Sequence, residues 1–277
     1  MSIYKTFKNN SLNDIVNILF SRLTGGRVDF RASSAVGKYR AQLSIKVASM
    51  MNYKVHYGIF KGFRLSKDVF WGEKDLGSKV LGLYELEIQQ LLSSMQKKKK
   101  KSILVDVGGA DGFYAVGSLV NNIFDKCICF ELTKQGRASI ERTALDNGVT
   151  DRLQILGEAN VNSFSSVLAS YVDLLDCVIL IDIEGGEYSL LTDKVLNKLK
   201  QTEVIIEIHI LDEQQELERK RLMGVVSGLF DLSVIRTSGR DFSTIDKDYH
   251  FTDTDRGLLT SEGRERLGEW WHLSPKK

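Results

Sequence analysis

A stretch near the middle of the chain, SILVDVGGADGFY at 102–114, constrains the fold most strongly. Its apolar, β-branched start predicts a short buried strand that ends in a carboxylate at Asp106. A glycine turn follows, and a helical pattern resumes at Phe113. A strand, a turn with few Cβ atoms and the free N–H groups of a helix together predict a nucleotide or nucleoside site. The turn that we expect to hold this ligand consists of Gly108, Gly109, Ala110, Asp111 and Gly112.

The charges near this turn favour one class of cofactor. A dinucleotide-binding turn has the pattern Gly-x-Gly-x-x-Gly, whereas this turn reads GGADG and follows Asp106 by two residues. Asp106 and Asp111 would repel a pyrophosphate and attract the ammonium and sulfonium groups of S-adenosylmethionine. The next predicted strand, 126–132, carries Glu131 near its end, where a carboxylate can accept both hydroxyls of an unphosphorylated ribose. We therefore predict an S-adenosylmethionine site, with a purely structural turn as the alternative.

Polar residues also follow the third and fourth predicted strands, at 152–156 and 177–183. Ligands of an open parallel sheet bind outside the carboxyl ends of its strands, so these residues are candidates for the site. Glu158 and Asn160 could meet an adenine edge, although a polar surface loop explains them equally well. Asp182 ends the fourth strand in VILIDIEGGE, and it should face a cation or a donor because burying an unpaired carboxylate costs on the order of several kcal/mol.

The fifth predicted strand, 203–210, places a histidine at the same edge of the sheet. Its alternation puts Glu207 and His209 on one face, with His209 at the rim. A neutral imidazole suits the role of general base for a hydroxyl proton, and we predict His209 and Asp182 as catalytic residues. Two alternatives stay open. The pair could bind a divalent metal, for which two ligands are too few, or His209 could cap the next helix through Asp212.

Strand and helix patterns alternate from 102 to 237 and predict an α/β fold with parallel strands and helices on both faces. Residues 101–277 are expected to form the cofactor-binding domain. Residues 1–100 are expected to form a basic α+β extension of helices and a hairpin. The elements predicted there are helices at 10–23, 36–51 and 75–95 and a β-hairpin at 53–72, with Phe63, Phe70 and Trp71 near the core.

The charges are unevenly distributed along the chain. Residues 1–101 contain 19 Lys and Arg against 7 Asp and Glu, whereas residues 102–277 contain 19 against 29. The basic part suits an anionic partner such as a phosphorylated substrate or a membrane surface. It lacks the interleaved aromatic and basic residues of a nucleic-acid module, so we do not expect a nucleic-acid partner.

The cysteines and the hydropathy indicate a compartment. Cys127, Cys129 and Cys177 fall on predicted buried strands, and the first two share a strand face, which is the wrong geometry for a disulfide between them. We expect small core residues in a reducing compartment. No apolar run approaches the ~20 residues of a membrane span, and the sequence MSIYKTFKNN lacks an apolar signal core. These features predict a cytoplasmic protein.

Four segments, DVGGADGFYAVG, FELT, IDIEGGE and IIEIH, together resemble the FkbM-type family of class I S-adenosylmethionine-dependent methyltransferases. The likeness extends to YGIFKGFRLSKDVFWGEKDLGSKVLGLYE and SEGRERLGEWWHLSP and leaves residues 1–52 outside it. The turn GGADG departs from the GANxG that is frequent in the family. The resemblance implies a seven-strand, mostly parallel, Rossmann-like sheet with a final antiparallel strand pair. It assigns Asp106 and Gly108 to Gly112 to the methionine end, Glu131 to the ribose, and Asp182 to a place between cofactor and acceptor.

The resemblance also implies O-methylation of a hydroxyl, commonly on a sugar or natural product. The acceptor we expect is a hydroxyl-bearing small molecule or glycan, and the basic extension suits a nucleotide-linked or lipid-linked sugar. Two other classes stay open: a dinucleotide-dependent sugar reductase, and a non-catalytic adaptor with a degenerate methyltransferase fold. Near the end of the chain, Trp270 and Trp271 could close over the acceptor or anchor the terminus, and we favour the anchor.

Overall fold

The structure is a computed structural model, and it describes residues 35–68, 72–98, 100–170, 172–241, 243, 250–264 and 268–276. The predicted helix at 10–23 lies outside these residues, as do Phe70 and Trp71 of the predicted hairpin. Among the described residues, no helix is long and apolar enough to cross a membrane.

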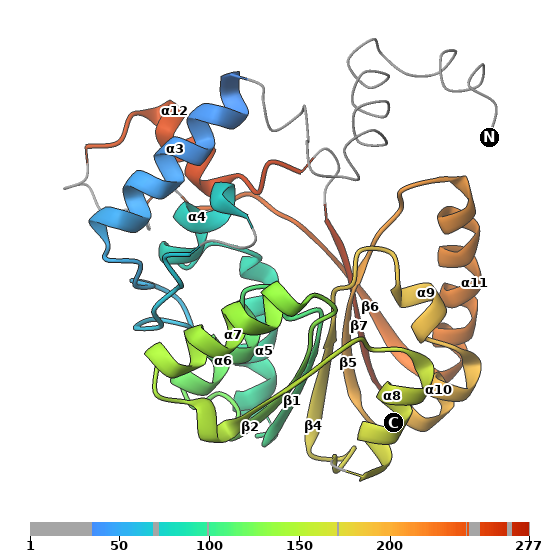
Figure 1. Ribbon diagram of the computed structural model, residues 1–277. Helices are drawn as coiled ribbons and strands as arrows, with labels where there is room; N and C mark the ends of the chain where they lie inside the picture. The colour runs from blue at the N-terminus through green and yellow to red at the C-terminus, as the bar shows by residue number, and fades with distance from the viewer. Residues whose placement is uncertain are drawn as a thin grey trace.

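A seven-stranded sheet runs through the centre of the described structure (Figure 1). Its strands, in the spatial order β3-β2-β1-β4-β5-β7-β6, are Leu153–Leu156, Lys126–Phe130, Ile103–Val107, Cys177–Ile181, Glu203–Ile208, Glu269–Pro275 and Phe230–Arg236. Strands β1 to β5 pair in parallel, and β7 is antiparallel to both β5 and β6. The predicted seven-strand, mostly parallel sheet is therefore confirmed. The strand order reverses between β1 and β4, which is where ligands of open α/β sheets bind.

Helices cover both faces of this sheet, as the alternating pattern predicted (Figure 1). Strand β4 is buried along its whole length, because Cys177–Ile181 is apolar on both faces. Side chains of one face, such as Leu104 and Cys129, pack with α5 (Leu86–Lys98), α6 (Phe113–Val120) and α7 (Lys134–Asp146). The opposite face, with Val105 and Ile179, packs against α8 (Val161–Ser170), α9 (Glu187–Leu190), α10 (Asp193–Leu199) and α11 (Glu213–Leu229). The three cysteines are free and buried, as expected.

The residues before the sheet share its core. Helix α3 (Ala35–Met50) confirms the helix predicted at 36–51, and it lies beside α4 (Leu76–Val80) and α12 (Asp253–Thr260) (Figure 1). Phe60 and Phe63 are fully buried, and both contact the ring of Phe113 from α6. This segment therefore packs directly on the helix that begins at the glycine turn.

Two predictions for this segment are wrong. The hairpin expected at 53–72 is reduced to one antiparallel bridge between Lys54 and Arg64, with turns between them. The helix expected at 75–95 is a short 3-10 turn η2 (Glu73–Asp75), α4 and α5, interrupted around Gly82. Gly82 has φ 68° and lies so close to Tyr57 that a Cβ would overlap the Tyr57 carbonyl. This close approach ends the helix although the apolar periodicity continues through it.

The two tryptophans near the end of the chain anchor it to the core, as favoured above. Trp270 and Trp271 lie on β7, between β5 and β6, and are 3% and 0% exposed. Trp270 and Trp271 pair with Glu207 and Ile206 of β5, respectively. This pairing holds the antiparallel strand β7 between β5 and β6.

Candidate active site

The glycine turn joins the carboxyl ends of three neighbouring strands. Gly108 has φ 103°, and a Cβ there would overlap the carbonyl oxygen of Asp182 after β4. Gly109 has no room for a Cβ because Cys129 of β2 lies against it. The N–H groups of both glycines donate to the Phe130 carbonyl at 2.9 and 3.0 Å. The absence of side chains thus lets β1, β2 and β4 end around one small space, as the glycines predicted.

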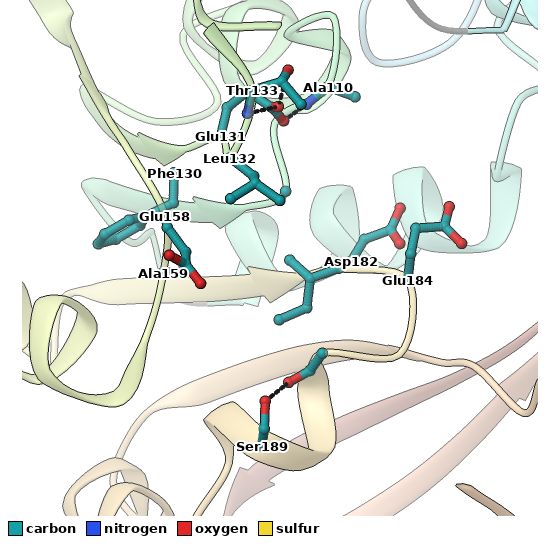
Figure 2. A pocket seen from close by; sticks show the side chains of 13 residues that line it. Ala110, Phe130, Glu131, Leu132, Thr133, Glu158, Ala159, Asp182, Glu184 and Ser189 are labelled. Carbon is teal, nitrogen blue, oxygen red and sulfur yellow. Dashed lines mark hydrogen bonds between the residues drawn. The ribbon is translucent and has the colours of Figure 1, made fainter. Parts of the chain in front are cut away.

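Glu131, at the end of β2, is held firmly beside this turn. Its Oε2 accepts the N–H of Ala110 at 3.1 Å, and its Oε1 accepts the backbone N–H and the hydroxyl of Thr133 at 2.8 and 2.7 Å. Figure 2 shows these hydrogen bonds at the cavity wall. Three donors fix the carboxylate where the sequence predicted a ribose partner.

A cavity of about 320 Å³ opens at this edge of the sheet (Figure 2). Its charged lining side chains are all acidic: Glu131, Glu158, Asp182 and Glu184. The other lining residues are Gly108, Ala110, Phe130, Leu132, Thr133, Ala159, Ile183, Gly186 and Ser189. Four carboxylates without a Lys, Arg or His among the described lining residues make a site that attracts cations and repels phosphates.

Five residues that the sequence placed at the cofactor do not line the cavity: Asp106, Gly109, Asp111, Gly112 and Asn160. Asn160 does not line the cavity, and its Oδ1 accepts the N–H groups of Asn162 and Ser163 at the start of α8. Asp111 pairs at 2.6 Å with Lys79 of α4, a lysine only 3% exposed. Asp106 is 1% exposed beneath the turn. Asp111 is thus paired with a residue distant in the sequence, Asn160 hydrogen-bonds within its own turn, and Asp106 is buried.

Asp106 is a buried carboxyl whose charge is poorly compensated. Burial and the acidic side chains of Glu131 and Asp111 raise the pKa of Asp106 to about 7, although a hydrogen bond from the Ala115 N–H acts in the opposite direction. Asp106 therefore lies beneath the turn and not in the lining of the cavity.

The predicted proximity of Asp182 and His209 is confirmed. Asp182 Oδ1 lies 3.7 Å from His209 Nε2, with the two residues following β4 and β5. Asp212 caps α11 with its own side chain, accepting the N–H of Gln215 at 2.8 Å. The imidazole is free of that cap, so the capping alternative for His209 is wrong.

Carboxylates surround the His209 ring, whose side chain is 12% exposed. Glu184 Oε2 and Glu207 Oε2 lie 3.4 and 3.6 Å from Nε2, and Glu187 Oε1 lies 3.5 Å from Nδ1. Burial lowers the pKa of His209, but Glu187, Glu207 and Glu184 outweigh it and raise the pKa above its usual value. Burial and neighbouring acids also raise the pKa of Asp182 and Glu207, which share a hydrogen bond.

A buried ion-pair network that sequence reasoning missed supports this cluster. Arg264 binds Glu207 Oε1, and it also binds Glu85 Oε1 at 2.7 Å. Glu85 is 2% exposed, and its Oε2 accepts the Tyr114 hydroxyl at 2.7 Å. Glu85 also has φ 45°, in the left-handed region that non-glycine residues rarely adopt. Glu85 and Arg264 lie in LGLYE and SEGRER, two segments that carry the family resemblance. That resemblance was the only feature of the sequence that pointed to these two residues.

No family model matches the chain, and no curated protein matches it in sequence. Solved structures with a similar arrangement include an O-methyltransferase from Bacillus cereus in complex with SAH, 10% identical, covering 94% of this chain and 96% of that chain at a TM-score of 0.47. The O-methyltransferase TomG from Streptomyces achromogenes, in complex with SAM, is 12% identical with the same coverage and TM-score. The METTL16 methyltransferase domain is 8% identical, covering 71% of this chain and 69% of that chain at 0.47.

Proposed function

We propose that this chain is an S-adenosylmethionine-dependent O-methyltransferase of the FkbM type. The observation that carries the proposal is the charge of the cavity: four carboxylates and no basic side chain among its described lining residues. A sulfonium and an ammonium are attracted to such a site, whereas the pyrophosphate of a dinucleotide is repelled. The acidic lining thus favours the methyltransferase over the reductase.

The lining residues suit the parts of the cofactor in order along the sheet edge. Glu131, already oriented by Ala110 and Thr133, has lone pairs that can accept the two ribose hydroxyls. Glu158 and Ala159, after β3, lie where an adenine edge would reach. The backbone of Gly108 lies beside Asp182, so the methionine end would lie between β1 and β4.

When bound, the cofactor supplies an electrophilic methyl group. Transfer of this methyl group would form a C–O bond to the acceptor oxygen and leave the electron pair of the broken C–S bond on sulfur. The hydroxyl proton leaves to His209 Nε2, beside Asp182. Because the carboxylates raise the His209 pKa, this base is available on the alkaline side of the usual imidazole range.

The acceptor we propose is a sugar or glycan hydroxyl, on a nucleotide-linked or lipid-linked molecule. Sugar hydroxyls can donate hydrogen bonds to the acidic side chains around His209, while the basic N-terminal part suits a phosphate farther along the substrate. Comparing a free sugar with its nucleotide diphosphate form as acceptors tests this assignment. Equal turnover of both forms would contradict a role for the basic residues.

Ligand-induced thermal stabilisation distinguishes the function classes. S-adenosylhomocysteine should raise the melting temperature by mass action, and NAD⁺ should not. Asn160→Ala, outside the cavity, should respond like the unmodified chain, whereas Glu131→Gln should respond less. Stabilisation by NAD⁺ alone would favour the reductase, and a chain stabilised by neither ligand would favour the adaptor.

A further inference from the structure

A second cavity, of about 540 Å³, opens beyond the end of β6, between the residues that follow this strand, the end of α12 and the start of β7. Ile208 at the end of β5 and Arg236 at the end of β6 both pair with Glu269, the first residue of β7. Strand β6 therefore runs in the same direction as β5, and the second cavity lies at the same edge of the sheet as the first. The two cavities share no lining residue in the described part of the chain.

The walls of the two cavities differ in chemistry. The first cavity includes the apolar side chains of Phe130, Leu132 and Ile183. The second is lined by glycines, hydroxyl residues and the charged Arg240, Glu262 and Arg264, without an aliphatic or aromatic residue among those that the structure describes. Pockets for aromatic or aliphatic ligands are mostly apolar, so the second cavity suits a hydrophilic ligand.

The two arginines of the second cavity are already neutralised. The Arg240 side chain is 2% exposed and pairs with Glu87 and Glu262, each at 2.5 Å. Arg264 pairs with Glu262 at 2.8 Å and with the two buried carboxyl groups described above. Four carboxyl groups thus face two guanidiniums, which leaves no excess positive charge for a phosphate or sulfate. The cavity therefore favours a neutral ligand.

Hydrogen-bonding groups remain for such a ligand. Three of the five N–H groups of Arg264 donate to carboxylates, and the other two have no partner among the described residues. Ser261 Oγ accepts the N–H of Gly263 at 3.0 Å, and its own hydroxyl has no acceptor in the described structure. The hydroxyls of a sugar both donate and accept hydrogen bonds, so they can use these groups.

Arg264 also relates the second cavity to the proposed base. It lines the cavity and binds Glu207, whose Oε2 lies 3.6 Å from His209 Nε2. One guanidinium and one carboxyl group therefore separate the cavity from the imidazole. A ligand in the cavity would lie beside the position of the methylated hydroxyl and not on it.

We propose that the second cavity binds the sugar residue next to the methylated one in a neutral oligosaccharide. This inference deepens the proposed function and rests on it, because it places the acceptor hydroxyl beside His209. A phosphate linked to the acceptor would lie outside this cavity. Sugar binding itself requires no nucleoside, so it can be measured separately.

Two helical glycines offer a blocking variant and its matched control. Gly257 on α12 lines the cavity, Gly224 on α11 does not, and a Cβ at either position would meet nothing within 4 Å. Gly257→Leu should therefore fold and obstruct the cavity, whereas Gly224→Leu places the same side chain on another helix. Gly239→Leu, in equally open surroundings after β6, is a second blocking variant.

Saturation-transfer NMR with neutral gluco-, galacto- and manno-configured disaccharides measures binding to the full chain without nucleoside. We expect binding by the unmodified chain and Gly224→Leu, and an affinity at least about tenfold lower in Gly257→Leu and Gly239→Leu. A disaccharide that contains a uronic acid should bind the unmodified chain more weakly than its neutral counterpart. Absence of binding by all the neutral disaccharides, tighter binding of the uronic acid, or equal affinity in blocking and control variants would overturn the proposal.

S-adenosylhomocysteine separates this inference from the proposed function. The nucleoside should raise the melting temperature of Gly257→Leu as much as that of the unmodified chain, because the cavities share no described lining residue. A chain that is stabilised by the nucleoside but binds no neutral disaccharide retains the proposed function and loses only the sugar site. A chain that binds disaccharides in this cavity but is not stabilised by the nucleoside loses the methyltransferase function instead.

Discussion

The two halves of the cavity edge differ in how their charges are compensated. At β1 and β2, Glu131 accepts three hydrogen bonds and Asp111 is paired with Lys79. At β4 and β5, the carboxylates around His209 outnumber the cations. Apart from the buried Asp106, these carboxylates of the first half are hydrogen-bonded or ion-paired, whereas the second half carries negative charge that a ligand or protons must compensate. We infer that the first half binds a nucleoside and the second performs chemistry, since perturbed pKa values concentrate at functional sites.

Removing the positive charge of Arg264 from the second half should have the largest effect, a loss of stability. Arg264→Met leaves Glu85 and Glu207 buried without a cationic partner and should cost about 3–5 kcal/mol of unfolding free energy at pH 9. The loss should shrink at pH 5, because both carboxyl groups have raised pKa values and become protonated. Urea denaturation at the two pH values measures it. Arg236→Met is the control, since Arg236 is 65% exposed and should cost less than about 1 kcal/mol. An equal loss of unfolding free energy in Arg264→Met and Arg236→Met would contradict the proposed excess of negative charge in the second half.

Changing the proposed base should separate chemistry from nucleoside binding. His209→Asn should lower turnover by about 10²–10⁴ while leaving S-adenosylhomocysteine affinity nearly unchanged. The turnover of the unmodified chain should rise with pH through the raised imidazole pKa, because only the neutral ring accepts a proton. Initial rates across pH, with His272→Asn as control, check both points. Full activity in His209→Asn would show that the second half has another base.

The matching change in the first half should affect binding. Glu131→Gln keeps the side-chain volume but loses the charge and one acceptor, and it should weaken S-adenosylhomocysteine binding by about 2–3 kcal/mol. Gln is preferable to Ala here because Ala would leave three buried or partly buried donors unpaired. Isothermal titration calorimetry gives the affinity, with Asn160→Ala as control. Unchanged affinity would show that Glu131 only organises the turn.

Asp106 should change how stability depends on pH. Asp106, in the first half, has a pKa raised to about 7, above its usual value in the unfolded chain. Its contribution to stability is therefore fully present below about pH 4 and is lost as the pH rises through about 7. Asp106→Asn should remove on the order of 1 kcal/mol per pH unit of this loss within that range. Parallel stability curves for both chains would show that Asp106 is compensated like its neighbours.

The sequence predicted the first half better than the second for a physical reason. The strand, the glycine turn and Glu131 lie within 30 residues, so local patterns specify them. The second half joins residues 85, 182–187, 207–209 and 264, and no local pattern indicates that Arg264 meets Glu85 and Glu207. The sequence did not indicate that Asp106 is buried or that Asp111 pairs with Lys79, because a carboxylate near a turn can face inward or pair with a distant lysine. The sheet was predictable because its strands are continuous apolar runs.

A crystal structure of the chain with S-adenosylhomocysteine would show directly whether the nucleoside occupies the first half of the site and leaves the second half to the acceptor. We expect the ribose hydroxyls on Glu131, the adenine beside Glu158 and Ala159, and the sulfur near Gly108 and Asp182. The nucleoside should thus occupy the first half and leave the carboxylates around His209 facing the acceptor space. A nucleoside bound away from Glu131, or one that covers His209, would contradict the division of the site into two halves.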